Sequence, residues 1–214
     1  MFNLFFDFCV SGLKDINIGV ELNGIKVCAL MYADDLVLMA ECENDLQELV
    51  SSVFENCAKN GLKMNVSKTK VLVFERDEAR TNCKVTVENE CLEQVNEYVY
   101  LGSMFSRDGK CEKEIERRKV AGCRVGGALR PIMRNNNVSL QAKKLVHNTI
   151  LLPSMMYGCE TWTWTKKEEC SINAVEMKSL RRICGKTLWD MERNENIRKE
   201  CGMEVSFVTK MKVN

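Results

Sequence analysis

Two apolar segments separated by a pair of adjacent aspartates form the most regular hydrophobic pattern in the chain. Residues 25–33 and 36–40 are each long enough to form a buried strand. A tight turn is the shortest connection between antiparallel strands. The pattern therefore predicts a strand ending at Tyr32 or Ala33, a turn carrying Asp34 and Asp35, and a return strand through Ala40.

The segment before this hairpin has the pattern of a hairpin of its own. Residues 18–22 and 25–31 flank Asn23-Gly24, and Asn-Gly supplies the positive φ angles of a type I′ turn. The second of these strands continues into the aspartate turn. A meander of three strands is therefore expected by residue 40.

Helical spacing replaces strand alternation after Asn44. Asn44 and Gln47 match a capping box, and Gly61 is placed as a helix stop. Between them, apolar residues recur along one helical face, at Leu46, Leu49, Val50, Val53 and Cys57. This helix is expected to pack across one face of the sheet, with further strands at 62–65, 69–74, 84–87 and 97–105.

From Cys111 onward the pattern is mostly helical. A first helix carries a stripe of Ile115, Gly122, Gly126 and Leu129, and Pro131 is expected to bend or end it. The two glycines could let either a neighbouring helix or a duplex backbone come close. Further helices are predicted from Ser139 through 152, from Thr165 through 184 with Gly185 as its stop, and over 194–201. The fold class is therefore α+β, with an antiparallel sheet and a packed helix in residues 1–106, followed by a mostly helical region in residues 107–214.

Composition describes a globular protein without a membrane span. The chain has 214 residues, of which 45% are hydrophobic and 29% charged, and no apolar run reaches the length of a transmembrane helix. The apolar start carries Asp7 and lacks a basic leader, so it is a poor signal peptide. A nuclear or cytoplasmic location is expected. The 12 cysteines contain no C-x-x-C spacing, which favours reduced thiols over zinc ligands or disulfides.

The near-neutral net charge hides an asymmetry between the two halves. Residues 1–75 contain 6 basic and 11 acidic residues, whereas residues 107–144 contain 11 basic and 4 acidic ones. An acidic half that could bind a cation, followed by a basic helical half, suits a protein whose partner is a polyanion held near a metal.

The paired aspartates are the main candidates for chemistry. Carboxylates flanked by apolar strands, with no basic residue between Lys26 and Lys59, favour a bound cation. Hard oxygen ligands of this kind suit Mg²⁺, with Mn²⁺ as a substitute. The alternative is an ordinary turn pair, because aspartate is common in turns.

Three motifs in sequence order carry a family resemblance. Tyr32-Ala33-Asp34-Asp35, residues 61–70 (Gly-Leu-Lys-Met-Asn-Val-Ser-Lys-Thr-Lys) and Tyr100-Leu101-Gly102 resemble successive motifs of the reverse transcriptases of non-LTR (LINE-type) retrotransposons. The similarity extends more loosely through 157–162 to 193–195. It implies an RNA-directed DNA polymerase, a nucleotidyltransferase, with a palm in residues 1–106 and a thumb-like region in residues 107–214.

The resemblance also implies roles for individual residues and partners. Asp34 and Asp35 would be catalytic metal ligands, supported by Tyr32 and Ala33, and Lys68 would act at the nucleoside triphosphate. The hairpin of Tyr100, Leu101 and Gly102 would grip the primer end. The implied partners are an RNA template, a DNA primer and a dNTP. Nucleic-acid contacts are expected from the basic helices at Arg117, Arg118, Arg124, Arg130 and Arg134.

Each of these roles has a structural alternative that the residues leave open. Lys68 could be a solvated strand residue, and Gly102 could simply mark a bulge. Charged residues on amphipathic helices are most often just the solvated face. The single histidine, His147, is expected to be a surface or packing residue, because no ligand or triad partner lies at useful spacing.

Two-metal catalysis needs a third carboxylate from another strand. Before Asp34 the candidates are Asp7, Asp15 and Glu21, and none has the expected strand context. In the resembled family this aspartate lies upstream, with the fingers and the endonuclease portion of the polyprotein. The chain is therefore expected to be a fragment that is inactive alone. The alternatives are a non-catalytic nucleic-acid-binding remnant that uses the basic helices, and a non-functional product that aggregates.

Overall fold

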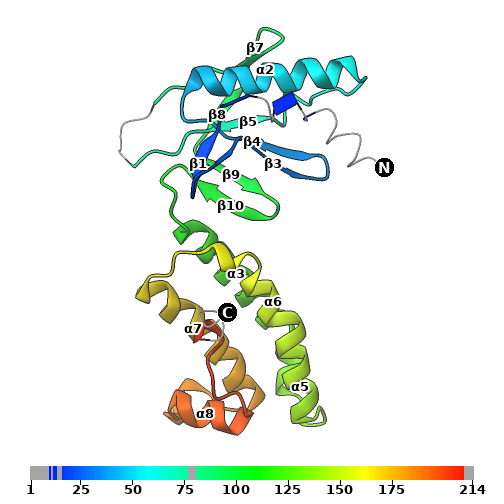
Figure 1. Ribbon diagram of the computed structural model, residues 1–214. Helices are drawn as coiled ribbons and strands as arrows, with labels where there is room; N and C mark the ends of the chain where they lie inside the picture. Colours follow the sequence, from blue (N-terminus) through cyan, green and yellow to red (C-terminus); the bar gives the residue numbers. More distant parts are fainter. Residues whose placement is uncertain (1–9, 11, 14–15, 77–80, 210–214) are drawn as a thin grey trace. The chain divides into compact units, whose positions relative to one another are not determined.

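The computed structural model describes residues 10, 12–13, 16–76 and 81–209 of the chain. The chain divides into two compact units, Met1–Tyr98 and Val99–Asn214. The first unit combines short strands with one long helix, and the second is mostly helical (Figure 1). The α+β fold class predicted from the sequence is confirmed.

Short paired strands make up the sheet structure of the first unit. Two antiparallel hairpins come first, β1 (Val20–Leu22) with β2 (Ile25–Val27) and β3 (Ala29–Tyr32) with β4 (Asp35–Leu38). The parallel pair β5 (Lys70–Leu72) and β8 (Glu93–Val95) and the antiparallel hairpin β6 (Thr86–Val87) and β7 (Glu90–Cys91) follow.

The predicted meander of three strands is wrong, because the chain changes its partner strand at Cys28. Val27 pairs with Val20, whereas Ala29 pairs with Leu38. The Cys28 carbonyl accepts a hydrogen bond from the Met39 N–H at 2.8 Å. The expected long strand is therefore divided between two separate hairpins. Residues 62–65, also predicted as a strand, lie outside the strands of the structure.

Helix α2 (Glu43–Lys59) carries the predicted buried face, and its residues contribute to two apolar clusters. Leu49, Val53 and Cys57 contact a cluster that includes residues of β3 and β4. Val50 contacts a second cluster built on β5, β6 and their connections. The predicted cap is wrong. The Cys42 sulfur accepts from the Asp45 N–H, while Gln47 instead exchanges two hydrogen bonds with the Thr86 backbone, at 2.8 and 2.9 Å.

The second unit begins with a hairpin and continues as a group of helices. β9 (Glu97–Tyr100), which crosses the boundary between the units, pairs with β10 (Ser103–Ser106). The single strand predicted over 97–105 is therefore folded back at Leu101-Gly102, where both residues have positive φ. The helices are α3 (Glu112–Ala128), α4 (Arg130–Arg134), α5 (Leu140–Val146), α6 (Leu152–Met156), α7 (Lys166–Ile183) and α8 (Asn194–Cys201).

The helix ends follow the predicted signals closely. Thr165 and Glu168 form a capping box at the start of α7, and the Ser139 hydroxyl accepts from the Ala142 N–H at the start of α5. Gly185 and Gly202 follow α7 and α8 with φ of 67° and 59°. The predicted helix over 139–152 is longer than expected. It continues through a π-helical segment, His147–Leu151, into α6.

One continuous apolar core joins the helices of the second unit. Ile115, Met155, Ile172, Leu180 and Ile197 are at most 2% exposed. The predicted stripe on α3 is buried, and its Gly122 lies so close to Met155 of α6 that a methyl group there would be 2.7 Å from the Met155 sulfur. The small residue thus admits a neighbouring helix, one of the two partners that its size suggested.

Among the described residues, no helix combines the length and the apolar character needed to cross a bilayer.

Candidate functional site

The aspartate hairpin places its two carboxylates differently from the prediction. Tyr32 pairs with Asp35 across the hairpin, so the turn residues are Ala33 and Asp34, and Asp35 is the first residue of β4. Ala33 has φ of 53°, a left-handed conformation that side chains other than glycine rarely adopt. The strand therefore ends at Tyr32, one of its two predicted ends, but the turn contains Asp34 without Asp35.

Strand alternation separates an inner and an outer face of this hairpin. Leu36 and Leu38 of β4 pack against the cluster under α2. Because successive side chains of a strand point to opposite faces, Asp35 lies on the other face, where Tyr32 is 66% exposed. Asp34 and Asp35 are both exposed. The apolar inner face supports a turn whose carboxylates are open to solvent.

The two carboxylates fit part of the ligand set of a Mg²⁺ ion. Mg²⁺ keeps several waters and takes one or two carboxylates together with substrate phosphates. Exposed, adjacent oxygen donors on a short supported turn meet that need. Within the described ranges, no group of three histidine, cysteine or acidic residues is close enough to hold a metal. Asp7 and Asp15, predicted as weak candidates for the third carboxylate, lie outside the described residues.

Lys68 lies in a turn organised by Asn65. The Asn65 side-chain oxygen accepts from the Ser67 hydroxyl at 2.8 Å and from the Lys68 N–H at 3.2 Å. The neighbouring Lys70 pairs with Glu93 at 2.6 Å, whereas the exposed Lys68 side chain makes no hydrogen bond or ion pair with the part of the chain that the structure describes. Of Lys68 and Lys70, Lys68 is therefore the lysine whose side chain is available to an anion.

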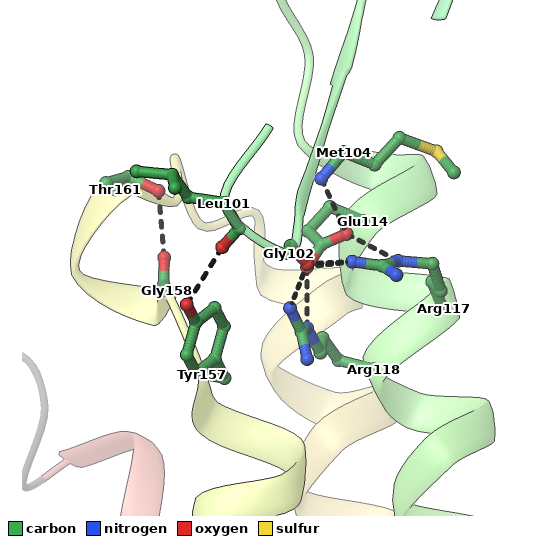
Figure 2. Close-up of polar contacts among 9 residues, drawn as sticks. All are labelled: Leu101, Gly102, Met104, Glu114, Arg117, Arg118, Tyr157, Gly158 and Thr161. Atoms are coloured by element: carbon green, nitrogen blue, oxygen red, sulfur yellow. Dashed lines mark hydrogen bonds and ion pairs between the residues drawn. The ribbon is translucent and has the colours of Figure 1, made fainter. Parts of the chain in front are cut away.

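The turn of the β9–β10 hairpin is held by side chains of α3 and by Tyr157, which directly follows α6 (Figure 2). The Tyr157 hydroxyl donates to the Leu101 carbonyl at 2.8 Å. Arg118 donates to the Gly102 carbonyl at 2.5 Å, and Arg117 donates to the same oxygen. The Arg118 guanidinium also lies over the Tyr157 ring, 4.7 Å from its centre. We call Glu114, Arg117, Arg118 and Tyr157 the hairpin clamp.

Glu114 is the centre of the hairpin clamp. Its side chain is only 2% exposed, and it accepts from Arg117 Nε at 2.8 Å and from Arg118 Nε at 2.6 Å. It also accepts from the Met104 N–H at 3.0 Å, which ties it to β10. Burial alone would raise the pKa of Glu114, but these hydrogen bonds outweigh it and hold the pKa below its ordinary value. The carboxylate therefore stays ionised in a nearly dry position.

An open groove of about 590 Å³ runs beside the clamped turn. Its lining is largely apolar and comes from β9–β10 and from residues 153–161. Aromatic side chains are prominent in it, with Tyr157 53% and Phe105 40% exposed. Exposed aromatic faces of this kind can stack on nucleobases. The groove is lined by Tyr100, Leu101, Ser103, Phe105, Pro153, Met156, Tyr157, Gly158, Glu160 and Thr161.

The five arginines predicted to contact nucleic acid fall into two groups. Arg117 and Arg118 are engaged in the hairpin clamp, whereas Arg124, Arg130 and Arg134 are exposed. Arg182 of α7 lies near this group, but it is half-buried and donates to the Gly126 carbonyl at 2.5 Å. Burial and then repulsion from Arg130 and Arg134 lower the pKa of Arg182. We call Arg124, Arg130, Arg134 and Arg182 the basic patch.

Three residues of these arrangements were not identified from the sequence. Glu114 precedes Arg117 and Arg118 at helical i,i+3 and i,i+4 spacing, a signal that was available. Tyr157 and Arg182 reach partners 56 residues away, and no local pattern marks such contacts.

His147 is a packing residue, one of the two positions expected for it. It is completely buried, and its Nδ1 lies 3.0 Å from the Ser179 hydroxyl. Its Nε2 has no hydrogen-bond partner within the described ranges. Burial lowers the pKa of His147, which keeps the ring neutral.

Comparison with known proteins extends over both units. The family described as "Reverse transcriptase (RNA-dependent DNA polymerase)" matches residues 1–105. A transposon-derived protein of Caenorhabditis elegans is 29% identical over 188 residues, which cover 85% of this chain and 64% of that protein. The Pol polyprotein of the type-1 retrotransposable element R2 of Nasonia vitripennis is 28% identical over 124 residues, which cover 54% of this chain and 12% of the polyprotein. The chain thus spans less than two thirds of either curated relative.

Proposed function

Because residues 1–105 belong to the reverse transcriptase family, we propose that this chain carries the late palm and the thumb-like region of an RNA-directed DNA polymerase of a non-LTR retrotransposon. The observation that carries the proposal is the β3–β4 hairpin. It presents two adjacent, exposed carboxylates on an apolar support.

In this proposal Asp34 and Asp35 bind Mg²⁺ through their carboxylate oxygens. A metal ion bound there would stabilise the charge that develops on the transferred phosphoryl group. Tyr32, which pairs with Asp35 across the hairpin, forms part of the floor of the site, and the left-handed Ala33 brings the chain round to Asp34. Lys68 neutralises or protonates the leaving pyrophosphate of a dNTP, and its lack of a described carboxylate partner supports that role.

The nucleic-acid partners in this proposal are an RNA template and a DNA primer. The groove beside β9–β10 offers aromatic side chains to the primer end. The basic patch supplies guanidinium groups to phosphates, a contact that gives affinity without sequence preference.

The described residues provide two of the carboxylates that a metal pair requires, and a third would have to come from residues outside this set. As the family resemblance implies, we propose that the 214-residue chain does not polymerise DNA alone. The finding that would overturn this proposal is primer extension by the purified chain that disappears in the Asp34→Asn/Asp35→Asn variant.

Binding of Mn²⁺, followed by its electron paramagnetic resonance signal, tests the metal site directly. The Asp34→Asn/Asp35→Asn variant should lose most of the binding that the unmodified chain shows. Glu88→Gln/Glu90→Gln is a matched control, because it removes two exposed charges from the β6–β7 hairpin of the same unit. Equal binding by all three proteins would overturn the assignment and leave an ordinary turn.

A second candidate function is a non-catalytic module that binds nucleic acid through its basic helices. The observation in its favour is the basic patch, in which burial and then repulsion from Arg130 and Arg134 lower the pKa of Arg182. This function predicts duplex binding that weakens steeply with salt and is unaffected by Asp34→Asn/Asp35→Asn. Loss of duplex binding in that variant would contradict it.

A further inference from the structure

The turn of β9–β10 has a left-handed conformation that suits Gly102 but that Leu101 does not favour. Leu101 and Gly102 have φ of 46° and 79°. A left-handed conformation costs about 1–2 kcal/mol for an L-amino acid such as leucine. Hydrogen bonds from outside the turn can offset this cost.

The hairpin clamp supplies that support. Both turn carbonyls are hydrogen-bonded by its side chains, the Leu101 oxygen by Tyr157 and the Gly102 oxygen by the two arginines. The arginines come from α3, and Tyr157 directly follows α6, a helix that packs against α3 in the core of this unit. The turn is thus fixed to the helices and not only to its own strands.

Charge and geometry assign the two arginines to the hairpin. Arg118 is 14% exposed, and the Nε of each arginine is directed at Glu114 while an Nη2 reaches the Gly102 oxygen. A planar guanidinium can bridge a carboxylate and a carbonyl in this way, whereas an ammonium group is a point charge that cannot reproduce the fork.

We propose that Glu114, Arg117, Arg118 and Tyr157 are positioning residues, which fix the β9–β10 turn where the primer end must lie. This inference rests on the proposed function. The arginines act through the Gly102 carbonyl and Glu114, and phosphates are bound by the separate basic patch. Precise placement matters because a shift of about 1 Å in a reacting group can reduce a rate about a hundredfold.

The test uses the full chain and an RNA–DNA hybrid whose primer ends in a 4-thiothymidine, which forms a photo-crosslink to the protein it touches. Peptide mapping locates the crosslink, and fluorescence anisotropy at several salt concentrations gives the affinity and its salt dependence. Arg118→Lys keeps the charge and loses the fork. We expect its crosslink at residues 100–105 to fall about tenfold, with the slope of log Kd against log salt unchanged.

Arg124→Ala is the matched control, because it removes an exposed arginine from the same helix. We expect it to reduce the salt slope by about 0.7–0.9 for the lost phosphate contact and to leave the crosslink site in place. Tyr157→Phe removes only the hydroxyl that bonds Leu101, so it remains informative if Arg118→Lys fails to fold. It should also lower the crosslink yield at the hairpin.

The outcomes separate the inference from the proposed function. If the unmodified chain does not bind the RNA–DNA hybrid, the proposed function is overturned. A crosslink at the hairpin that survives unchanged in a folded Arg118→Lys variant, or in Tyr157→Phe, would overturn the positioning role alone. A reduced salt slope in Arg118→Lys would also overturn that role, because it would show a phosphate contact.

Discussion

The β3–β4 and β9–β10 hairpins share a construction and differ in how their turns are held. Each has a two-residue turn whose first residue, Ala33 or Leu101, is left-handed. The β9–β10 turn is bonded by two arginines of α3 and by the tyrosine that follows α6, whereas the β3–β4 turn carries two exposed carboxylates on an apolar face.

Under the proposed function, this difference would suit the two hairpins to different tasks. A turn that binds a metal must leave its ligands accessible, so it is supported from one face only. A turn that positions a macromolecule can be held from behind by buried polar groups, because its exposed edge alone needs to reach the partner. The first arrangement contributes little to stability, and the second contributes much. Four predictions test this contrast and the packing around it. They are given from the largest expected effect on stability to the smallest.

Replacement of Glu114 should have the largest effect on stability. Glu114→Ala leaves two guanidinium groups without their buried acceptor and removes the partner of the Met104 N–H. We expect a loss of about 2–4 kcal/mol in the free energy of unfolding, less than the full value for a buried pair because Arg117 is partly exposed. Urea unfolding of the full chain measures it. Glu116→Ala, which removes an exposed partner of Lys119, is the control and should change stability by less than about 1 kcal/mol. If Glu114→Ala and Glu116→Ala lower the free energy of unfolding equally, Glu114 is not the centre of the hairpin clamp.

Two glycines of α3 test how tightly the helices behind the hairpin clamp are packed. Gly122→Ala would push a methyl group against the Met155 side chain, 2.7 Å from its sulfur, and should cost about 1–3 kcal/mol by overpacking. Gly127→Ala lies in the same helix with open space around it, and it should stabilise by about 0.4–1 kcal/mol. Thermal unfolding should therefore shift in opposite directions. Shifts of the same sign would show that α3 and α6 pack less closely than described.

The pH dependence of stability should have a step due to His147, the only histidine. Burial, followed by the Arg198 charge, holds the pKa of folded His147 below its ordinary value of 6.5, while Glu176 acts in the opposite sense. As the pH falls below about 6.5, the unfolded chain takes up a proton that the folded chain does not, so the free energy of unfolding decreases. His147→Gln should remove this step and leave the acid loss due to Glu114, which begins below that carboxyl's ordinary pKa of 4.5. An unchanged pH profile in His147→Gln would show that the ring does not stay neutral.

The sequence predicted the parts of this fold that local chemistry decides. The helix stops at Gly61, Gly185 and Gly202 are confirmed, because glycine is the residue that a left-handed cap favours. The family resemblance carried by the three motifs is also confirmed by the match over residues 1–105 and by the two transposon relatives.

What the sequence did not predict depends on long-range contacts. The exchange of strand partners at Cys28 is set by pairing with Met39, and Gln47 leaves its expected capping role to bind Thr86. The hairpin clamp was missed for the same reason. Arg117 and Arg118 match a phosphate-binding pattern in sequence, and only a carbonyl 15 or 16 residues away explains their engagement. The metal-binding role of Asp34 and Asp35 and the action of Lys68 stay predictions.

The smallest expected change in stability belongs to the aspartate turn. Asp34→Asn/Asp35→Asn should change the free energy of unfolding by no more than about 0.5 kcal/mol, because both side chains are exposed and the apolar face of the hairpin is untouched. Urea unfolding without divalent ions checks this. When Mn²⁺ is added, only the unmodified chain should gain stability, since a ligand that binds the folded state alone stabilises it by mass action. The Glu88→Gln/Glu90→Gln control should gain as the unmodified chain does. A large loss of stability without metal would mean that the carboxylates hold the turn together, and the contrast between the two hairpins would then fail.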